Sequence, residues 1–239
     1  MTAPLQTRRD GPLTELVLNR PDKANALNAE LIEALLEAVE TASSDGTRLL
    51  VLRGKGKVFC GGFDFSGLDS QSDGDLVLRF IRIEQLLQAV HHAPVATMVL
   101  CQGAAYGAGA DLVSSCDHRI ATPGARFRMP GLRFGIALGT RRLAECIGSA
   151  AADRVLSESR TFDADEARQM GLATAVTPVA EWDAAVARAL KGETLDGPAK
   201  ARLKACIKQD MRAVDMAALV ASASVPGLKA RIKAFRTEA

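Results

Sequence analysis

The sequence has no apolar run that approaches the length needed to cross a membrane, and residues 1–11, with Arg8, Arg9 and Asp10, contain no apolar core for a signal peptide. We therefore expect a soluble, cytoplasmic protein. An excess of charge is also missing. The 30 Lys and Arg against 28 Asp and Glu leave a formal net charge of +2, which is too small to suggest a nucleic-acid partner. No repeat or low-complexity segment is visible.

Cysteine and histidine are scarce. The five cysteines are an odd number, spaced irregularly and without a Cys-x-x-Cys pair, so we expect reduced, mostly buried thiols. His91 and His92 are adjacent, and on a helix they would point about 100° apart. His118 stands beside Cys116 and Asp117, but neighbours on a strand face opposite sides. We predict no metal site.

The 239 residues are 48% apolar and 24% charged, an ordinary globular composition with room for one main domain. Alternation predicts a strand at residues 13–18. Asn28 is placed as the N-cap of a helix that runs to about residue 43, and Gly46 is expected to close it. A short buried strand should follow at residues 49–52.

Apolar residues at intervals of three and four over residues 76–90 predict a second helix, which Pro94 ends. Residues 95–100 and 118–121 favour strands, so the first half alternates strand and helix. From Thr140 onward the pattern is almost wholly helical, with Gly148 and Gly171 as expected stops. We divide the chain into a core domain, residues 1–190, and a C-terminal helical region, residues 191–239.

Two smaller signals fall in this helical part. Asp163 and Glu166 are spaced like an N-cap and its third-residue partner. The last predicted helix, residues 227–236, aligns Leu228, Ile232 and Phe235 on one stripe. We expect that stripe to pack on the core or on a neighbouring subunit.

The segments 51–64 and 99–111 share a design, in which a strand leads into a glycine pair and then an acid, Asp64 or Asp111. Two such turns facing each other could each supply one backbone N–H to a single oxygen, which is what stabilising an enolate requires. The alternative is that the glycines only serve tight turns. A dinucleotide fingerprint is excluded because Leu112 stands where its third glycine would be, and no Gly-Lys-Ser/Thr phosphate loop is present.

Three segments, residues 18–28, 59–64 and 103–117, resemble in order and spacing the three signatures of the crotonase superfamily, the enoyl-CoA hydratase/isomerase family. The resemblance covers nearly the whole chain. It implies an α/β fold, a crotonase-like spiral of repeated strand-strand-helix units with a C-terminal helical region, assembled as a homotrimer or a dimer of trimers. It also implies a role in fatty acid metabolism on an acyl-CoA substrate. Coenzyme A is then part of the substrate, and no cofactor is permanently bound.

The resemblance also implies roles for residues. By position, the N–H groups of Phe63 and Ala108 form the oxyanion hole, while Gly107 and Gly109 give the thioester oxygen room. The residues that match the coenzyme A arm of the family pattern are Lys23, Ala24, Ala26, Gly61, Asp64 and Phe65.

The departures from the family pattern limit the reaction. A hydratase of this family uses two glutamates to hold and activate water. Here the first position is Asp111 and the second, after Pro130, is Gly131, and the loop at residues 135–140 is shortened. Proton transfer alone needs only one carboxylate, a role that Asp111 can fill. The resemblance implies a lyase or an isomerase. Over true hydration we favour a reaction that needs at most one acid: double-bond isomerisation with Asp111 as acid/base, thioester hydrolysis or decarboxylation.

Several alternatives stay open at this point. Asp111 could instead cap its helix or pair with Arg128 or Arg133. Those arginines could bind a carboxylate on the acyl group, or be solvated. Tyr106 could donate to an acyl oxygen or pack, and Glu145 could replace the missing acid or lie in solvent.

The C-terminal region is basic, and its charges either solvate helix faces or pair with coenzyme A phosphates: Lys200, Arg202, Lys204, Lys208, Lys229 and Lys233. The leading hypothesis is an enzyme that stabilises a thioester enolate. The alternative is a catalytically silent acyl-CoA-binding protein of the same fold, favoured by Gly131 and disfavoured by the carboxylate of Asp111.

Overall fold

The computed structural model describes residues 3–238. The first two residues of the predicted core domain and the last residue of the predicted helical region lie outside the described residues. The strands are β1 (Leu5–Asp10), β2 (Leu13–Leu18), β3 (Leu49–Gly54), β4 (Ala96–Cys101), β5 (Ala104–Tyr106), β6 (His118–Ala121), β7 (Arg126–Arg128), β8 (Phe162–Asp163) and β9 (Ala175–Val176). The α-helices are α1 (Ala29–Ala42), α2 (Asp73–His91), α3 (Ala108–Ser114), α4 (Thr140–Ile147), α5 (Ser149–Glu158), α6 (Ala164–Met170), α7 (Trp182–Gly192), α8 (Gly197–Ile207), α9 (Arg212–Ala223) and α10 (Leu228–Glu238).

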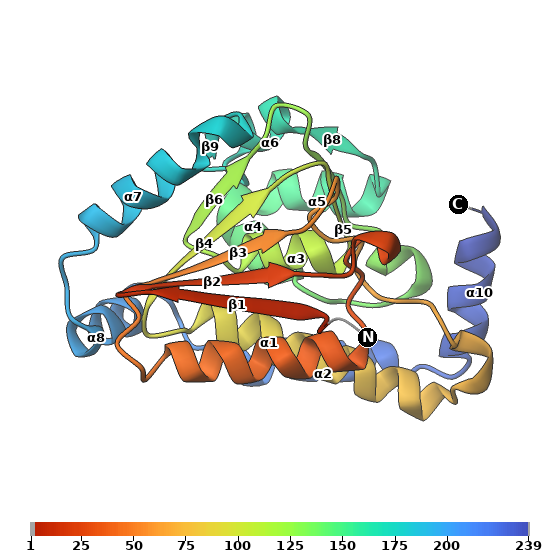
Figure 1. Cartoon of the computed structure of the whole chain (residues 1–239). Helices are drawn as coiled ribbons and strands as arrows, with labels where there is room; N and C mark the ends of the chain where they lie inside the picture. Colours follow the sequence, from red (N-terminus) through yellow and green to blue (C-terminus); the bar gives the residue numbers. More distant parts are fainter. Residues whose placement is uncertain (1–2, 239) are drawn as a thin grey trace.

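A six-stranded sheet of order β1-β2-β3-β4-β6-β9 forms the centre of the molecule, with α1 and α2 along one side (Figure 1). β1 is antiparallel to β2, and the other neighbours are parallel. The strands predicted at residues 13–18, 49–52, 95–100 and 118–121 are confirmed, with shifts of a residue or two at their ends. β1 was not predicted; only its first two residues are even partly buried.

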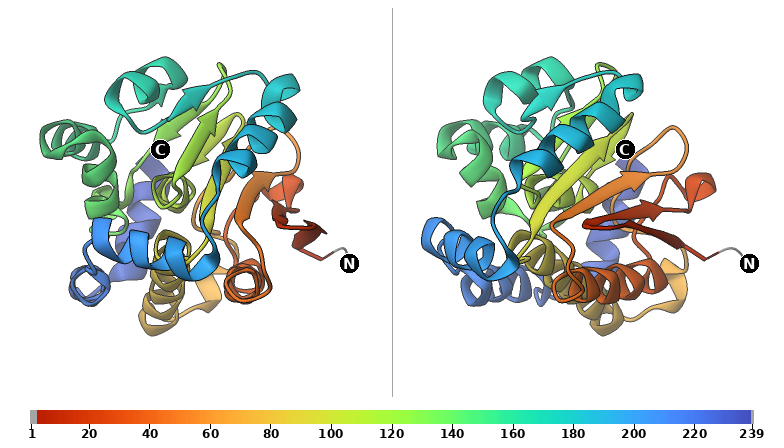
Figure 2. Two further views of the ribbon diagram at one scale, coloured as in Figure 1. Left: turned by 90° about the vertical axis from the view of Figure 1, so that its left-hand side faces the viewer. Right: turned by 60° about the vertical axis from the view of Figure 1, so that its left-hand side comes forward.

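The sheet is covered on both faces because its central strands are apolar at nearly every position. On β3, Leu50 and Leu52 face the main core, while Leu49 and Val51 face a second cluster that contains Trp182 of α7. Figure 2 shows α7 running across that second face. This two-sided burial explains the continuous apolar runs in the sequence.

A smaller sheet of order β5-β7-β8 lies beside the first. β5 occupies residues inside the glycine-rich segment, which sequence reasoning treated as one turn. Residues after Thr140 are likewise less helical than predicted, because β8 and β9 pair with β7 and β6. These strands are two or three residues long, too short to give a periodic signal.

The helices follow their predicted signals closely. Asn28 caps α1, its side chain accepting a hydrogen bond from Leu31 N–H, and α2 ends at His91. Asp163 caps α6 through Glu166 N–H. The prediction that Gly46 closes α1 is wrong: the helix ends at Ala42, and Gly46 adopts its left-handed conformation in the loop beyond.

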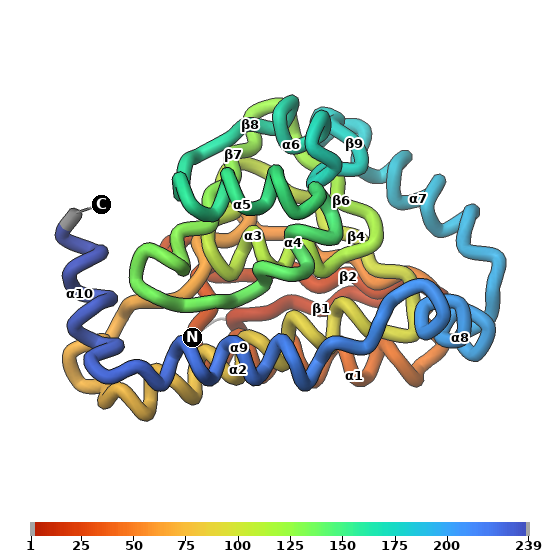
Figure 3. Tube along the Cα trace, turned by 180° about the vertical axis from the view of Figure 1, so that it is seen from behind, coloured from red at the N-terminus to blue at the C-terminus, as the bar shows by residue number. Residues whose placement is uncertain are grey.

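The C-terminal helices fold back along the core. α9 lies beside α2 and leads into α10 (Figure 3). Leu228 and Ile232 are fully buried, and the Phe235 ring lies 5.2 Å from that of Phe134, so the predicted stripe packs on the chain's own core. Within residues 3–238 no single helix is long and apolar enough to cross a membrane; α9 and α10 pass that test only as a pair bent by 79°.

Candidate active site

A mainly apolar cavity opens where the two glycine-rich segments meet α10. The space inside it, counting the part open to solvent, is about 620 Å³. Asp111, Tyr106 and Thr140 bring side-chain oxygens to its lining. Its apolar wall includes Phe65, Phe80, Phe134, Leu138, Leu156 and Phe235.

The two segments touch because glycine lets them. A Cβ on Gly62 would lie 2.4 Å from the Tyr106 carbonyl oxygen, and a Cβ on Gly109 would lie 2.4 Å from that of Cys60. Any other residue would force the segments apart. The two glycines therefore bring Phe63 and Ala108 to the lining of the same cavity.

The backbone amides of Phe63 and Ala108 are both left without an acceptor among the described residues. In the parallel bridge between Leu27 and Phe63, Leu27 N–H donates to Gly62 and Asp64 N–H donates to Leu27, so the Phe63 amide is not used. Ala108 is the first residue of α3, where an N–H has no partner within the helix. Both residues line the cavity, so two backbone N–H groups without an acceptor belong to its lining.

Asp111 is a buried carboxyl group at the fourth position of α3, with an exposed fraction of 4%. Its Oδ1 is buried without a hydrogen-bond partner, and a Cβ on Gly139 would lie 2.1 Å from that atom. Burial raises the pKa of Asp111 well above its ordinary value, while the charge of Arg142 lowers it and that of Glu84 raises it. Burial therefore favours the protonated form of this carboxyl group.

The rival roles for Asp111 are not realised. Arg128 donates from Nε to the carbonyl of Ser159 at 2.8 Å, and Asp111 makes no ion pair with it. Neither Arg128 nor Arg133 belongs to the lining of the cavity in the described part of the chain. The described lining of the cavity therefore contains no arginine to recognise a carboxylate on an acyl group.

Gly131 lines the cavity at the start of a 3-10 helix, Gly131–Phe134, so the position of the missing glutamate faces the ligand space with no side chain. Glu145 does not replace it. That carboxylate is half-exposed, pairs with Arg141 and lies 3.8 Å from His91, facing a separate hollow. Asp111 is the only carboxylate in the described lining of this cavity.

Of the residues predicted to contact coenzyme A, Gly61, Phe65 and Gly107 belong to the described lining of the cavity, whereas Lys23, Ala24, Ala26 and Asp64 do not. Lys23 is exposed at the end of a 3-10 helix, and the next residue, Ala24, accepts a hydrogen bond from Gly61 N–H. Asp64 is buried and lies 2.8 Å from Arg20. Burial alone would raise the pKa of Asp64, but hydrogen bonds from Ser66 and the ion pair with Arg20 hold it below its ordinary value. Asp64 therefore braces this loop.

Ala26, Phe65 and Gly107 are also among the predicted residues of the site. Ala26 supplies its carbonyl oxygen to the guanidinium of Arg20. Phe65 lines the mouth of the cavity, with the Arg236 guanidinium 5.5 Å from its ring centre. Gly107 joins β5 to α3 with a φ of 50°, a left-handed backbone that favours glycine.

Sequence reasoning missed several residues of the site. The Arg79 guanidinium lies 4.0 Å from the centre of the Phe63 ring and donates to the Asp64 carbonyl. Arg79, on α2, thus holds the segment that contains Phe63 and Asp64 in place. Thr140, the first residue of α4, and Phe235 of α10 also line the cavity. The periodic pattern of α2 predicted its buried face but gave no signal for Arg79.

Most of the C-terminal basic residues pair within the chain. Lys204 is buried and donates to the carbonyls of Ala93 and Val95, and both it and Lys208 pair with Asp117. The other pairs are Lys200 with Glu193 and Lys233 with Asp69, and Lys229 donates to the Asp69 carbonyl. The charges at Lys204 and Lys208 thus anchor α8 to the core.

All five cysteines are free thiols, and Cys60, Cys101 and Cys116 are buried. Burial raises the pKa of the Cys60 and Cys116 thiols to about 12, so they are not nucleophiles. In residues 3–238 no group of three or more His, Cys, Asp or Glu side chains is arranged to hold a metal ion.

Comparison with known proteins gives the family. The enoyl-CoA hydratase/isomerase family model matches residues 8–225. A probable enoyl-CoA hydratase of Mycobacterium leprae is 37% identical over 185 residues, which cover 74% of this chain and 72% of that protein. A crystal structure of a Bordetella parapertussis protein assigned to the same family has a TM-score of 0.97 and 43% identity, covering 98% of this chain and 99% of that one. An enoyl-CoA hydratase of Bacillus halodurans has a TM-score of 0.85 at 26% identity, covering 97% and 99%. The chain belongs to the enoyl-CoA hydratase/isomerase family and has the crotonase fold.

Proposed function

We propose that this protein binds an acyl-CoA thioester, polarises its carbonyl through the N–H groups of Phe63 and Ala108, and moves a proton with Asp111 as the single acid/base. The reaction that fits best is double-bond isomerisation of an enoyl-CoA. The observation that carries the proposal is one buried carboxyl group, whose Oδ1 has no hydrogen-bond partner, in a cavity lined by two residues whose backbone N–H groups have no acceptor.

The proposed step needs no co-reactant. The Asp111 carboxylate takes a proton from C2 of a 3-enoyl thioester, and the electron pair of that C–H bond forms a dienolate whose oxygen accepts hydrogen bonds from Phe63 and Ala108. Asp111 then returns the proton at C4, which leaves the double bond between C2 and C3. Two preorganised donors stabilise the negative charge where it develops.

The lining supports a hydrocarbon acyl group. The wall is built largely from phenylalanine and leucine side chains, and its described lining includes no Lys or Arg. Burying an apolar chain there is favourable, whereas a carboxylate would lose its hydration without a partner. Gly131 argues against hydration, because the described lining holds no second carboxylate to orient water.

Coenzyme A is proposed to lie along Lys23, Ala24, Ala26 and Gly61, with Phe65 at the mouth of the acyl cavity. We also propose that the chain assembles as a homotrimer or a dimer of trimers. Ile207, Leu203 and Val214, on α8 and α9, have exposed fractions of 69%, 42% and 55%, which suits a contact between subunits. Size-exclusion chromatography should give a trimer or hexamer, and a pure monomer would refute the assembly.

The second candidate is a silent acyl-CoA-binding protein, which Gly131 favours. The two functions are separated by incubating wild type and Asp111→Ala with 2-enoyl-, 3-enoyl-, malonyl- and saturated acyl-CoA and identifying the products by mass spectrometry. The proposal predicts conversion of 3-enoyl-CoA by wild type alone. Raised melting temperature with these thioesters but no product from any of them would establish the silent binder.

A further inference from the structure

A buried group of charged side chains lies next to Asp111 and takes no part in the proposed step. Arg142 of α4 and Glu84 of α2 are each 1% exposed. The Arg142 guanidinium donates to both oxygens of Glu84, with 3.0 Å between Nη1 and Oε1, and Nη1 lies 3.0 Å from Oδ2 of Asp215 on α9. Three helices thus meet on one guanidinium.

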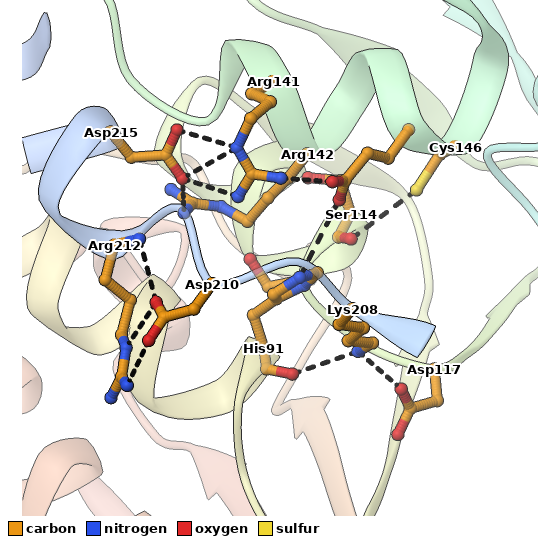
Figure 4. A network of polar contacts seen from close by, with 12 residues as sticks. His91, Ser114, Asp117, Arg141, Arg142, Cys146, Lys208, Asp210, Arg212 and Asp215 are labelled. Carbon is orange, nitrogen blue, oxygen red and sulfur yellow. Dashed lines mark hydrogen bonds and ion pairs between the residues drawn. The ribbon is translucent and has the colours of Figure 1, made fainter. Parts of the chain in front are cut away.

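The positive charge of Arg142 is fully matched by this group. Figure 4 shows Asp215 between the guanidinium groups of Arg141 and Arg142. Arg141 also pairs with Glu145. Two guanidinium groups therefore face three carboxylates, so this group carries no excess of positive charge beside Asp111.

The same group fixes the backbone against Asp111. Gly139, just before α4, lies so close to Asp111 that a Cβ would come within 2.1 Å of Oδ1. Arg142 lies in the first turn of α4, and its side chain ties that turn to α2 and α9. The position of the Asp111 carboxyl thus depends on an anchor that lies outside the cavity lining.

We propose that Glu84, acting through Arg142, is a positioning residue for Asp111: it neutralises the guanidinium beside Asp111 and holds the first turn of α4 against the carboxyl group. The inference rests on the proposed function, in which Asp111 moves the proton. A carboxylate that faced an unmatched guanidinium would stay ionised and would be a weaker base.

The charged and titratable groups around Asp111 come from each packed element. Glu84 faces it from α2 and Arg142 from α4, Asp215 of α9 acts through Arg142, and Tyr106 of β5 lines the same cavity. Burial raises the pKa of Asp111, and Glu84 adds to this effect while Arg142 opposes it. Removing the charge of Glu84 should therefore lower the pKa of Asp111, and removing the charge of Arg142 should raise it.

The test is a charge cycle of Glu84→Gln, Arg142→Met and the double variant, with Glu33→Gln, at an exposed pair with Arg82 outside this group, as the matched control. The midpoint of Asp111 is measured by carbon NMR of the aspartate carboxyl groups, with the signal assigned by its loss in Asp111→Asn. Glu84→Gln should lower the midpoint by about one pH unit and Arg142→Met should raise it by about as much. The double variant and Glu33→Gln should stay near wild type.

The pH profile of enoyl-CoA isomerisation should move with the NMR midpoint in each variant. Midpoints that stay fixed, or that move the same way in both single variants, would overturn the inference even in an active enzyme. If the wild type is inactive but the two single variants shift the Asp111 midpoint in opposite directions, the proposed function is refuted and the inference stands. If circular dichroism shows that Glu84→Gln does not fold, Asp215→Asn replaces it, because Asp215 is a less buried partner of Arg142. A smaller downward shift of the Asp111 midpoint would then support the inference, and an unchanged midpoint would overturn it.

Discussion

Gly109→Ala should separate the two halves of the proposed oxyanion hole. The new Cβ would lie 2.4 Å from the Cys60 carbonyl oxygen and 2.9 Å from the Cys60 Cβ, so backbone must move. Cys60 begins the loop that carries the Phe63 amide, and Gly109 follows directly on Ala108. Overpacking of this kind costs about 1–3 kcal/mol, which corresponds to a fall in Tm of roughly 2–12 °C for a chain of this size.

The effect on turnover should exceed the effect on stability. Misplacing one oxyanion-hole donor lowers kcat by about 10²–10³-fold. The assay is the rate of 3-enoyl-CoA isomerisation at saturating substrate, with thermal unfolding followed in parallel. Gly74→Ala is the matched control, because its Cβ would approach only Ser72 Oγ at 3.6 Å near the start of α2, and it should leave turnover unchanged. Gly109→Ala with wild-type turnover and Tm would refute the steric argument for the hole.

Three further predictions concern the acid, the vacant position and the tail. Gly131→Glu should add detectable hydration of crotonyl-CoA, measured by loss of enoyl absorbance, at some loss of stability because its Cβ would lie 3.0 Å from the Ile136 carbonyl. Since the pKa of Asp111 is raised on folding, its stabilising contribution is present at low pH and is lost as pH rises through the folded-state value. The free energy of unfolding of Asp111→Asn should therefore rise relative to that of the wild type as pH increases, measured by denaturation at several pH values. If the difference between the two proteins does not change with pH, the raised pKa of Asp111 is contradicted. Lys204→Met should lower the free energy of unfolding by about 3–5 kcal/mol, because it leaves Asp117 short of a buried partner, while the Kd for acyl-CoA, measured by calorimetry, stays constant.

The sequence predicted those parts of the fold that have long periodic signals. The helix capped by Asn28 and the apolar runs before each glycine-rich segment were found because burial on one face or both leaves a pattern. The short strand β5 was missed because three residues carry no period. The end of α1 was misjudged because Gly46 is a turn residue of the loop, beyond the last helical turn.

The candidate site was predicted unevenly for a physical reason. Phe63, Ala108 and Asp111 stand in local motifs, so their approach to one cavity could be anticipated from glycine spacing and family resemblance. Arg142 and Glu84 are 58 positions apart and meet only through tertiary packing. Nothing in their local sequence distinguishes them from solvated charges, and the same holds for Arg79 against the Phe63 ring.

The most direct test compares the isomerisation of 3-enoyl-CoA by wild type and by Asp111→Asn, a substitution that keeps the shape of the side chain but cannot take up the proton. Calorimetry with the same thioester serves as the control for binding. The account predicts binding within a few-fold of wild type and a loss of about 10²–10⁴-fold in kcat. Full turnover in Asp111→Asn, or hydration of 2-enoyl-CoA by wild type as its main reaction, would contradict the single-acid mechanism.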